Sequence, residues 1–308
     1  MARTYMRMPA PPILIGILIA SSLTVAAAVD RREVRSLVRT QAGATLIAES
    51  ARPIATAVEA LVSEYGYVIT YEDPRYIYDD DLVDVTTQVR KDLAKYPPGM
   101  APKVVGPKGG RLELNITEPT SVDDVERVLN QIVQTKVDSG RGGHFRSLRT
   151  GNVFHIVPTE VRDQNGNWST VASVLDAPIS LPAQEQTDSE MIKVICDAVT
   201  KAAHVQVNLG WTGLSGGVGI GPVGGRQSHR YPLRAENEPA RQVLMRALDE
   251  IAADRSRLTW VLLYDRAPTN SYYLSLIPVP LKQPPSTKTK PTVSGPTDVP
   301  EHRPTDVR

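Results

Sequence analysis

The first residues to consider are those whose types could support chemistry. Gly216–Gly221 lies in a glycine-rich stretch, and glycines let backbone amides approach a phosphate closely. A phosphate-binding loop also needs a helix directly after it, commonly opening with Gly-Lys-Ser or Gly-Lys-Thr. Here Pro222–Gly225 comes next instead. We therefore interpret the stretch as an insertion and predict no cofactor-binding site.

Four aspartates, Asp79, Asp80, Asp81 and Asp84, stand close enough in the chain to suggest calcium, which prefers several oxygen ligands. Their spacing is not that of an EF-hand, because no glycine or distal glutamate completes the loop. We expect a solvated acidic loop. The histidines never recur at metal-ligand spacing, so we predict no metal site. They are His144, His155, His204, His229 and His302.

A nucleophile needs a base and an acid partner, and the sequence offers no such set around Ser215. Cys196 lies on the apolar stripe of a predicted helix, which favours a buried, inert thiol over a reactive one. We predict no catalytic residues. A hydrolase that uses groups around the glycine-rich insertion stays open as an alternative.

The densest basic cluster is formed by Arg141, Arg146 and Arg149, together with Lys136. These side chains flank His144 at the start of a predicted hairpin. A solvated hairpin is the simplest interpretation. The alternative is a contact with an anion or with a partner, and these arginines are the candidate residues for it.

The chain has 308 residues, which is enough for two domains of ordinary size. Its 35 basic and 34 acidic residues nearly balance, so composition gives no reason to expect nucleic acid as a partner. A single cysteine excludes an internal disulfide framework.

The N-terminus has the pattern of an export signal. Arg3 and Arg7 precede an apolar run over residues 13–29, and Ala26 and Ala28 supply the small residues of a cleavage site. We predict a signal peptide over 1–28, a linker over 29–43 and a periplasmic or secreted location. The alternative is an uncleaved segment, which would be the only contact with a membrane.

Apolar spacing predicts helices over 52–65, 121–135, 189–203 and 238–252. Strands are predicted over 67–71, 112–116, 205–209 and 231–235, and hairpins over 145–157 and 258–277. Asn237 is the expected cap of the last helix, with Pro239 in its first turn.

These elements occur in the same order in the two halves of the chain. Both halves also close on similar segments, Val153–Pro158 and Tyr273–Pro278. We therefore predict an α+β fold of two tandem modules, each with two helices packed on small mixed sheets. The first spans 44–160 with an insertion at 76–107, and the second spans 170–280 with the Gly-rich insertion at 210–225. Residues 281–308 are rich in proline and threonine and are predicted to be a disordered tail.

Several segments of this pattern resemble the STN domain, the short N-terminal domain of secretins and TonB-dependent proteins that is also called the N0 type. Glu238–Leu244 and Leu258–Tyr264 stand where the family has its second helix and closing hairpin. Arg52–Leu61 and Tyr65–Ile69 resemble its opening helix and strand. The chain has neither a secretin pore region nor a TonB-dependent barrel after the modules, so a role inside a secretin does not carry over.

The resemblance implies an exported α+β module that makes protein–protein contacts in a bacterial cell envelope. We accordingly expect a non-enzymatic interaction or assembly protein whose partner is another envelope protein. Besides the hydrolase, a second alternative is an envelope sensor or regulator that stays anchored through an uncleaved N-terminal segment.

Overall fold

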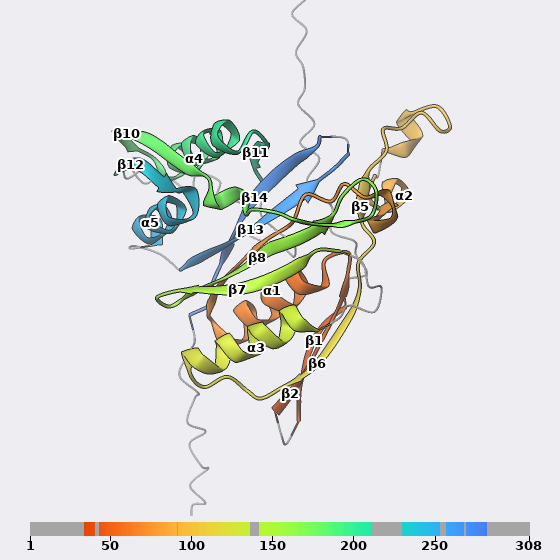
Figure 1. Ribbon diagram of the computed structural model, residues 1–308, viewed down its shortest axis with the longest axis horizontal. Coiled ribbons are helices and arrows are strands. Elements are labelled where there is room, and N and C mark those ends of the chain that lie inside the picture. Colours follow the sequence, from red (N-terminus) through yellow and green to blue (C-terminus); the bar gives the residue numbers. More distant parts are fainter. Residues whose placement is uncertain are drawn as a thin grey trace, which may run out of the picture.

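The computed structural model describes residues 34–40, 43–90, 92–135, 142–210, 230–252, 257–267 and 269–281. Helices and strands mix along this part of the chain, which confirms the α+β class (Figure 1). Several predictions lie outside the described residues, among them the signal segment with Ala26 and Ala28, the Gly-rich insertion beyond Gly210, and the tail beyond Leu281.

The main helices begin and end within two residues of their predicted bounds. They are α1 (Pro53–Tyr65), α3 (Val122–Gln134), α4 (Asp188–Ala203) and α5 (Ala240–Ala252). Capping boxes fix the starts of α3 and α4, where Ser121 and Thr187 accept hydrogen bonds from backbone N–H groups three residues on. Gly66 and His204 end α1 and α4 in the left-handed region.

The expected cap at Asn237 is wrong. Strand β12 (Tyr231–Pro239) continues to the residue before α5, so Asn237 and Pro239 belong to the strand and not to the helix. Asn237 has a φ of 50° and its N–H donates to Ser180 Oγ at 3.0 Å. The first helical N–H, at Ala240, donates to the Ala177 carbonyl at 3.0 Å, so the neighbouring chain takes the place of a side-chain cap.

The strands of the first half belong to two sheets. β2 (Gly43–Ser50) pairs antiparallel with β6 (Gly110–Ile116), and β1 (Val34–Thr40) adds to the other side of β2. β3 (Val68–Glu72) pairs parallel with β8 (Val153–Arg162), and β8 pairs antiparallel with β7 (His144–Thr150).

The second half repeats these pairings. β10 (Pro178–Gln186) pairs antiparallel with β12, as β2 does with β6. β11 (Gln206–Leu209) pairs parallel with β14 (Ser271–Pro278), and β14 pairs antiparallel with β13 (Leu258–Asp265), as β3, β8 and β7 do. The two halves therefore have the same order of elements and the same pairings.

Short elements fill the connections. β4 (Leu82–Asp84) pairs with β5 (Val105–Pro107), and the four-residue helix α2 (Thr86–Val89) lies between them in the chain. β9 (Trp168–Thr170) adds to the end of β8. Single 3₁₀ turns occur in the same connections and before β10. They are Asp79–Asp81, Leu93–Lys95 and Val174–Asp176.

The segment predicted as a linker, residues 29–43, instead supplies the strand β1 and the first residue of β2. Its many charged residues concealed this strand. Leu37 packs against the first core, while Arg35 and Arg39 reach glutamates on α1.

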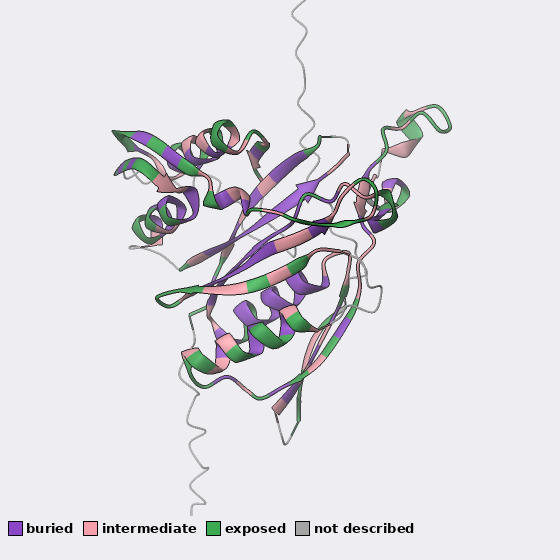
Figure 2. Ribbon diagram, viewed as in Figure 1, coloured by how far each residue is buried: buried purple, intermediate pink, exposed green. Residues whose placement is uncertain are grey.

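The two halves share one sheet, which the prediction of separate small sheets did not anticipate. β3 pairs parallel with β13, Tyr71 opposite Val261 and Glu72 opposite Leu262, which joins the strands in the order β11-β14-β13-β3-β8-β7. Alternate residues of β13 enter different cores: Val261 packs with the first half and Trp260 with the second. Helices α1 and α3 therefore cover one face of the sheet and α4 and α5 the other, with buried strands between (Figures 1 and 2).

Candidate functional site

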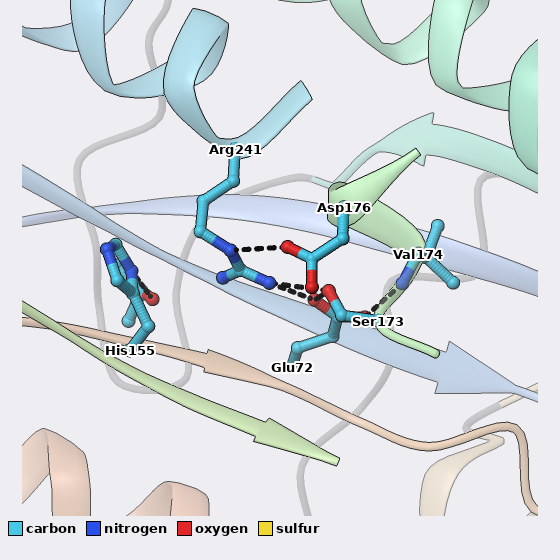
Figure 3. Close-up of polar contacts among 7 residues, drawn as sticks. Glu72, His155, Ser173, Val174, Asp176 and Arg241 are labelled. Atoms are coloured by element: carbon cyan, nitrogen blue, oxygen red, sulfur yellow. Dashed lines mark hydrogen bonds and ion pairs between the residues drawn. The ribbon is translucent and has the colours of Figure 1, made fainter. Parts of the chain in front are cut away.

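Buried charges gather where the two halves meet, at the seam between β3 and β13. Glu72, the last residue of β3, has a side chain that is 1% exposed. Its carboxylate accepts hydrogen bonds from Ser173 Oγ at 2.6 Å, from the Val174 N–H at 2.5 Å and from Arg241 Nη2 at 3.1 Å. Figure 3 shows these groups converging from β3, α5 and the segment before β10.

Arg241, in the first turn of α5, connects two carboxylates. Its Nη2 bonds Glu72, and its Nε donates to Asp176 Oδ1 at 3.1 Å. The Arg241 side chain is 7% exposed, whereas that of Asp176 is 45% exposed. Burial raises the pKa of Glu72 above its ordinary value, and the nearby Arg241 guanidinium opposes that rise only in part. The pair therefore fixes the position of the two halves more than it stabilises them.

A histidine lies in the sheet beside this cluster. His155 of β8 is fully buried, and its Nδ1 lies 2.9 Å from Thr70 Oγ1 on β3. Burial, with a smaller contribution from the Arg241 charge, lowers the pKa of His155 to about 3. The imidazole is therefore neutral at physiological pH. Its ring faces Trp260 of β13 at 5.8 Å, so it also belongs to the seam.

A second buried cluster lies further along the same seam. Asp73, which is fully buried, accepts from Arg52 Nε at 2.6 Å, from Tyr71 OH at 2.8 Å and from the Tyr264 N–H at 2.9 Å. Arg52 Nη2 in turn donates to the Tyr264 carbonyl at 2.7 Å. One carboxylate thus holds the end of β3, the start of α1 and the end of β13 together.

A cavity of about 30 Å³ lies beside Arg52 and Tyr71. A volume of that order accommodates about one water molecule and no organic substrate. In the first cluster charged side chains of the two halves face each other, and in the second the Arg52–Asp73 pair of the first half bonds the Tyr264 backbone of the second. This arrangement of hydrogen bonds and ion pairs holds one half in a fixed position against the other.

The structure does not gather the predicted basic cluster. Arg141 lies outside the described residues. Arg146 is exposed on β7, whereas Arg149 pairs with Asp123 and Glu126 of α3, its Nη1 lying 3.0 and 3.4 Å from their carboxylate oxygens. Of the arginines that the structure describes here, Arg146 is thus the better candidate for a contact with an anion or a partner.

The acidic run is not a uniformly solvated loop, and for Asp81 that prediction is wrong. Asp81 is 2% exposed, and Arg162 Nη2 lies 2.9 Å from its Oδ1. Asp79 points outward and accepts from Arg266 Nη1 at 2.5 Å. Among the described residues, no group of three or more His, Cys, Asp or Glu side chains is placed to hold a metal ion.

The two remaining candidates for chemistry are Cys196 and Ser215. Cys196 is buried in α4, and burial raises the pKa of its thiol to about 12, as expected for an inert cysteine. Ser215 lies outside the described residues. The residues from Gly213 to Gly217 do fit the Gly-x-Ser-x-Gly spacing of a nucleophile elbow, so the hydrolase alternative stays a hypothesis.

Comparisons with models of protein families, with curated proteins and with solved structures found no match. Within the described residues, no helix has the length and apolar character needed to cross a membrane.

Proposed function

We propose that this chain is an exported, non-enzymatic cell-envelope protein made of two STN-like modules, and that it binds or assembles with another envelope protein. The observation that carries the proposal is the repeated architecture. In each half a helix, a strand, a strand, a helix and a hairpin come one after another, with the same strand pairings. This is the order of elements that the resemblance to the STN domain implies.

The packing within each half supports the same proposal. In the first half α1 packs on the β2·β6 pair and on β3, while α3 packs on α1 and on β7 and β8. In the second half α4 and α5 pack on the β10·β12 pair and on β11 and β13. Each half thus has a core of its own, to which the other half adds residues, such as Val261 in the first core and Val161 in the second.

The seam supports an assembly role in a further way. Glu72 bonds groups of the second half and Asp73 bonds groups of both halves, so the two modules are held in a fixed relative position. A rigid pair of modules loses little conformational entropy when it binds a large partner. The exposed Arg146 on β7 is a candidate contact on such a face.

Capture of the partner tests the proposal. The full-length chain is expressed in its own host, crosslinked in intact cells and recovered through an affinity tag, and a matched sample carries Arg146→Glu. We expect one envelope protein to be enriched with the wild-type chain and to be reduced by the charge reversal. Recovery of no specific envelope partner, with or without crosslinking, contradicts the proposal.

The location is tested on the same material. We expect the mature chain in the periplasmic or culture fraction, with an N-terminus that begins after Ala28. A chain that keeps its first residues and stays with the membranes would favour the anchored sensor instead. Activity towards a panel of ester and amide substrates that depends on Ser215 would favour the hydrolase.

A further inference from the structure

The repeat makes the two modules comparable position by position, and one difference between them lies beside the first helix of each. In the first module β1 lies along the free side of β2 and against α1. Arg35 Nη1 approaches Glu59 Oε2 at 3.6 Å, and Arg39 pairs with Glu64. Leu37, between them, packs onto the core. A basic and partly apolar strand thus fills the space beside α1.

The same space in the second module is a groove. It lies between β10 and α4, with a volume of about 510 Å³, and among the described residues β10 pairs only with β12. One wall is the chain from Pro178 to Pro182 on β10. The other is α4, which contributes Val194, Asp197, Ala198 and Lys201.

The two helices can be aligned through their left-handed end residues, Gly66 and His204. Glu59 and Asp197 then occupy the same position, seven residues before the end. Ala60 matches Ala198 in the same way. The side of α4 that lines the groove is therefore the side that β1 covers on α1, and an acidic residue stands there in both modules.

We propose that this groove binds an extended segment of a partner protein, in which an arginine or lysine pairs with Asp197 and a neighbouring apolar side chain enters between β10 and α4. The proposal rests on the function proposed above and specifies the chemistry of the partner. Asp197 is the acidic side chain in the lining of the groove, which also contains Lys201, and it would pair with the basic residue of the segment as Glu59 does with Arg35.

Asp197 is accessible to such a partner. Its side chain is 53% exposed, and its present contact with Lys193 Nζ, at 2.8 Å, is an exposed pair of the kind that contributes little. Val194 and Ala198 are partly exposed apolar residues of the groove and offer a contact for an apolar side chain, as the first core does for Leu37. Pro178 and Pro182 have no N–H to donate, so the backbone ladder along β10 is short and the side chains carry more of the recognition.

The test uses the full chain and a peptide with the sequence of Val34–Thr40, because that strand fills the equivalent space in the first module. Binding of the labelled peptide is followed by fluorescence anisotropy at low salt, and amide hydrogen exchange locates the protected residues. The control peptide carries glutamate at both arginine positions. We expect saturable binding of the first peptide, protection of α4 and β10, and no binding of the control.

Two variants place the site. Asp197→Arg is expected to weaken binding by about tenfold, because it turns an attraction into a repulsion. Ala198→Trp is expected to block the groove without any change of charge. Asp249→Arg, an equal charge reversal on the exposed side of α5, is the matched control and is expected to bind as the wild type does. Circular dichroism confirms that each variant is folded.

The outcomes separate this proposal from the one it rests on. Absence of peptide binding, or equal binding to Asp197→Arg, overturns the groove proposal. An envelope partner that is captured equally by the wild type and by Asp197→Arg refutes the groove and leaves the envelope function standing. Failure to capture any partner, with the peptide still bound in the groove, refutes the envelope function alone. Self-association that Asp197→Arg abolishes identifies a second copy as the occupant and overturns the partner.

Discussion

The seam between the modules predicts a specific response to the loss of Arg241. In an Arg241→Met variant the aliphatic stem of the side chain is kept and the guanidinium is removed. Glu72 then loses its only cationic neighbour among the residues described around it, and it remains buried beside Ser173 Oγ and the Val174 N–H. Breaking a buried pair on one side costs roughly 3–5 kcal/mol of unfolding free energy.

The pH dependence has a definite sign. Burial already raises the pKa of Glu72, and removal of Arg241 takes away the main influence that lowers it. A carboxyl whose pKa is raised by folding binds protons more readily in the folded state, so its contribution favours folding at low pH and is lost as pH rises. The deficit of Arg241→Met is therefore expected to be larger at pH 8 than at pH 5.

Urea unfolding at pH 5, 6.5 and 8 measures these differences, with the fluorescence of the buried Trp260 as one probe. Glu72→Gln keeps an acceptor for Ser173, and Arg241 keeps Asp176 as its partner, so we expect this variant to cost less than Arg241→Met. The double variant, Glu72→Gln with Arg241→Met, should recover part of the loss and show no added pH dependence. Asp176→Asn serves as the exposed control.

Two results for Arg241→Met, and a third for the double variant, would refute the reasoning. One is a loss below about 1 kcal/mol in Arg241→Met, since that is the range of an exposed pair. The other is a deficit that does not change with pH, which would mean that the Glu72 charge is not the group left uncompensated. Additive effects of the two substitutions would equally deny the contact between their side chains.

Three further predictions concern single residues. His155, with its pKa lowered to about 3, stays neutral in the folded chain, whereas in the unfolded chain it takes up a proton near pH 6.5. The free energy of unfolding should therefore fall on acidification, by roughly 2–3 kcal/mol at pH 4.5. In urea titrations a His155→Leu variant should lose less stability between pH 7 and 4.5 than the wild type. Cys196 should react with a thiol reagent only as fast as the chain unfolds, in parallel kinetic measurements. Gly109→Ala should lower the melting temperature, because its Cβ would lie 2.0 Å from the Ser50 carbonyl oxygen at a φ of 62°.

Much of the local structure could be predicted because it depends on local pattern. The stripe of Val243, Leu244, Ala247, Leu248 and Ile251 is buried as its helical spacing predicts. Prediction failed where a distant segment decided the outcome. Asparagine is a residue type favoured at helix caps, but pairing with β10 extends the strand β12 through Asn237.

The internal alignment was off by two residues for a related reason. The sequence matches Val153–Pro158 to Tyr273–Pro278, since both are apolar and end in proline. The pairing shows instead that Val153 opposes Val68 as Ser271 opposes Gln206, so Val153 corresponds to Ser271. Hairpin register depends on the turn and on the partner strand, and neither is visible in the sequence alone.

The candidate site could not be predicted because its members lie far apart in the chain. Glu72 and Arg241 are 169 positions apart. The available signal was weak: a glutamate and an aspartate end an otherwise apolar strand at Glu72 and Asp73, and an arginine stands in the first turn of an apolar helix. Such residues usually face solvent, and only the joining of β3 to β13 places them inside.

The pairing of β3 with β13 also shows how the two halves differ at the edges of their sheets. It pairs unlike edges of a repeated unit, since β3 corresponds to β11 and β13 corresponds to β7. Contacts between unlike edges can continue from one copy to the next, because each copy keeps one edge of each kind.

The residue that corresponds to Glu72, six positions after the left-handed end of the helix, is Gly210, which has no carboxylate to pair with an arginine. β7, the counterpart of β13, instead presents Arg146 and Arg149, and charged side chains discourage pairing at an open edge. The two halves therefore keep one architecture but differ in the side chains at its edges, and this difference disfavours the formation of the same seam between separate chains.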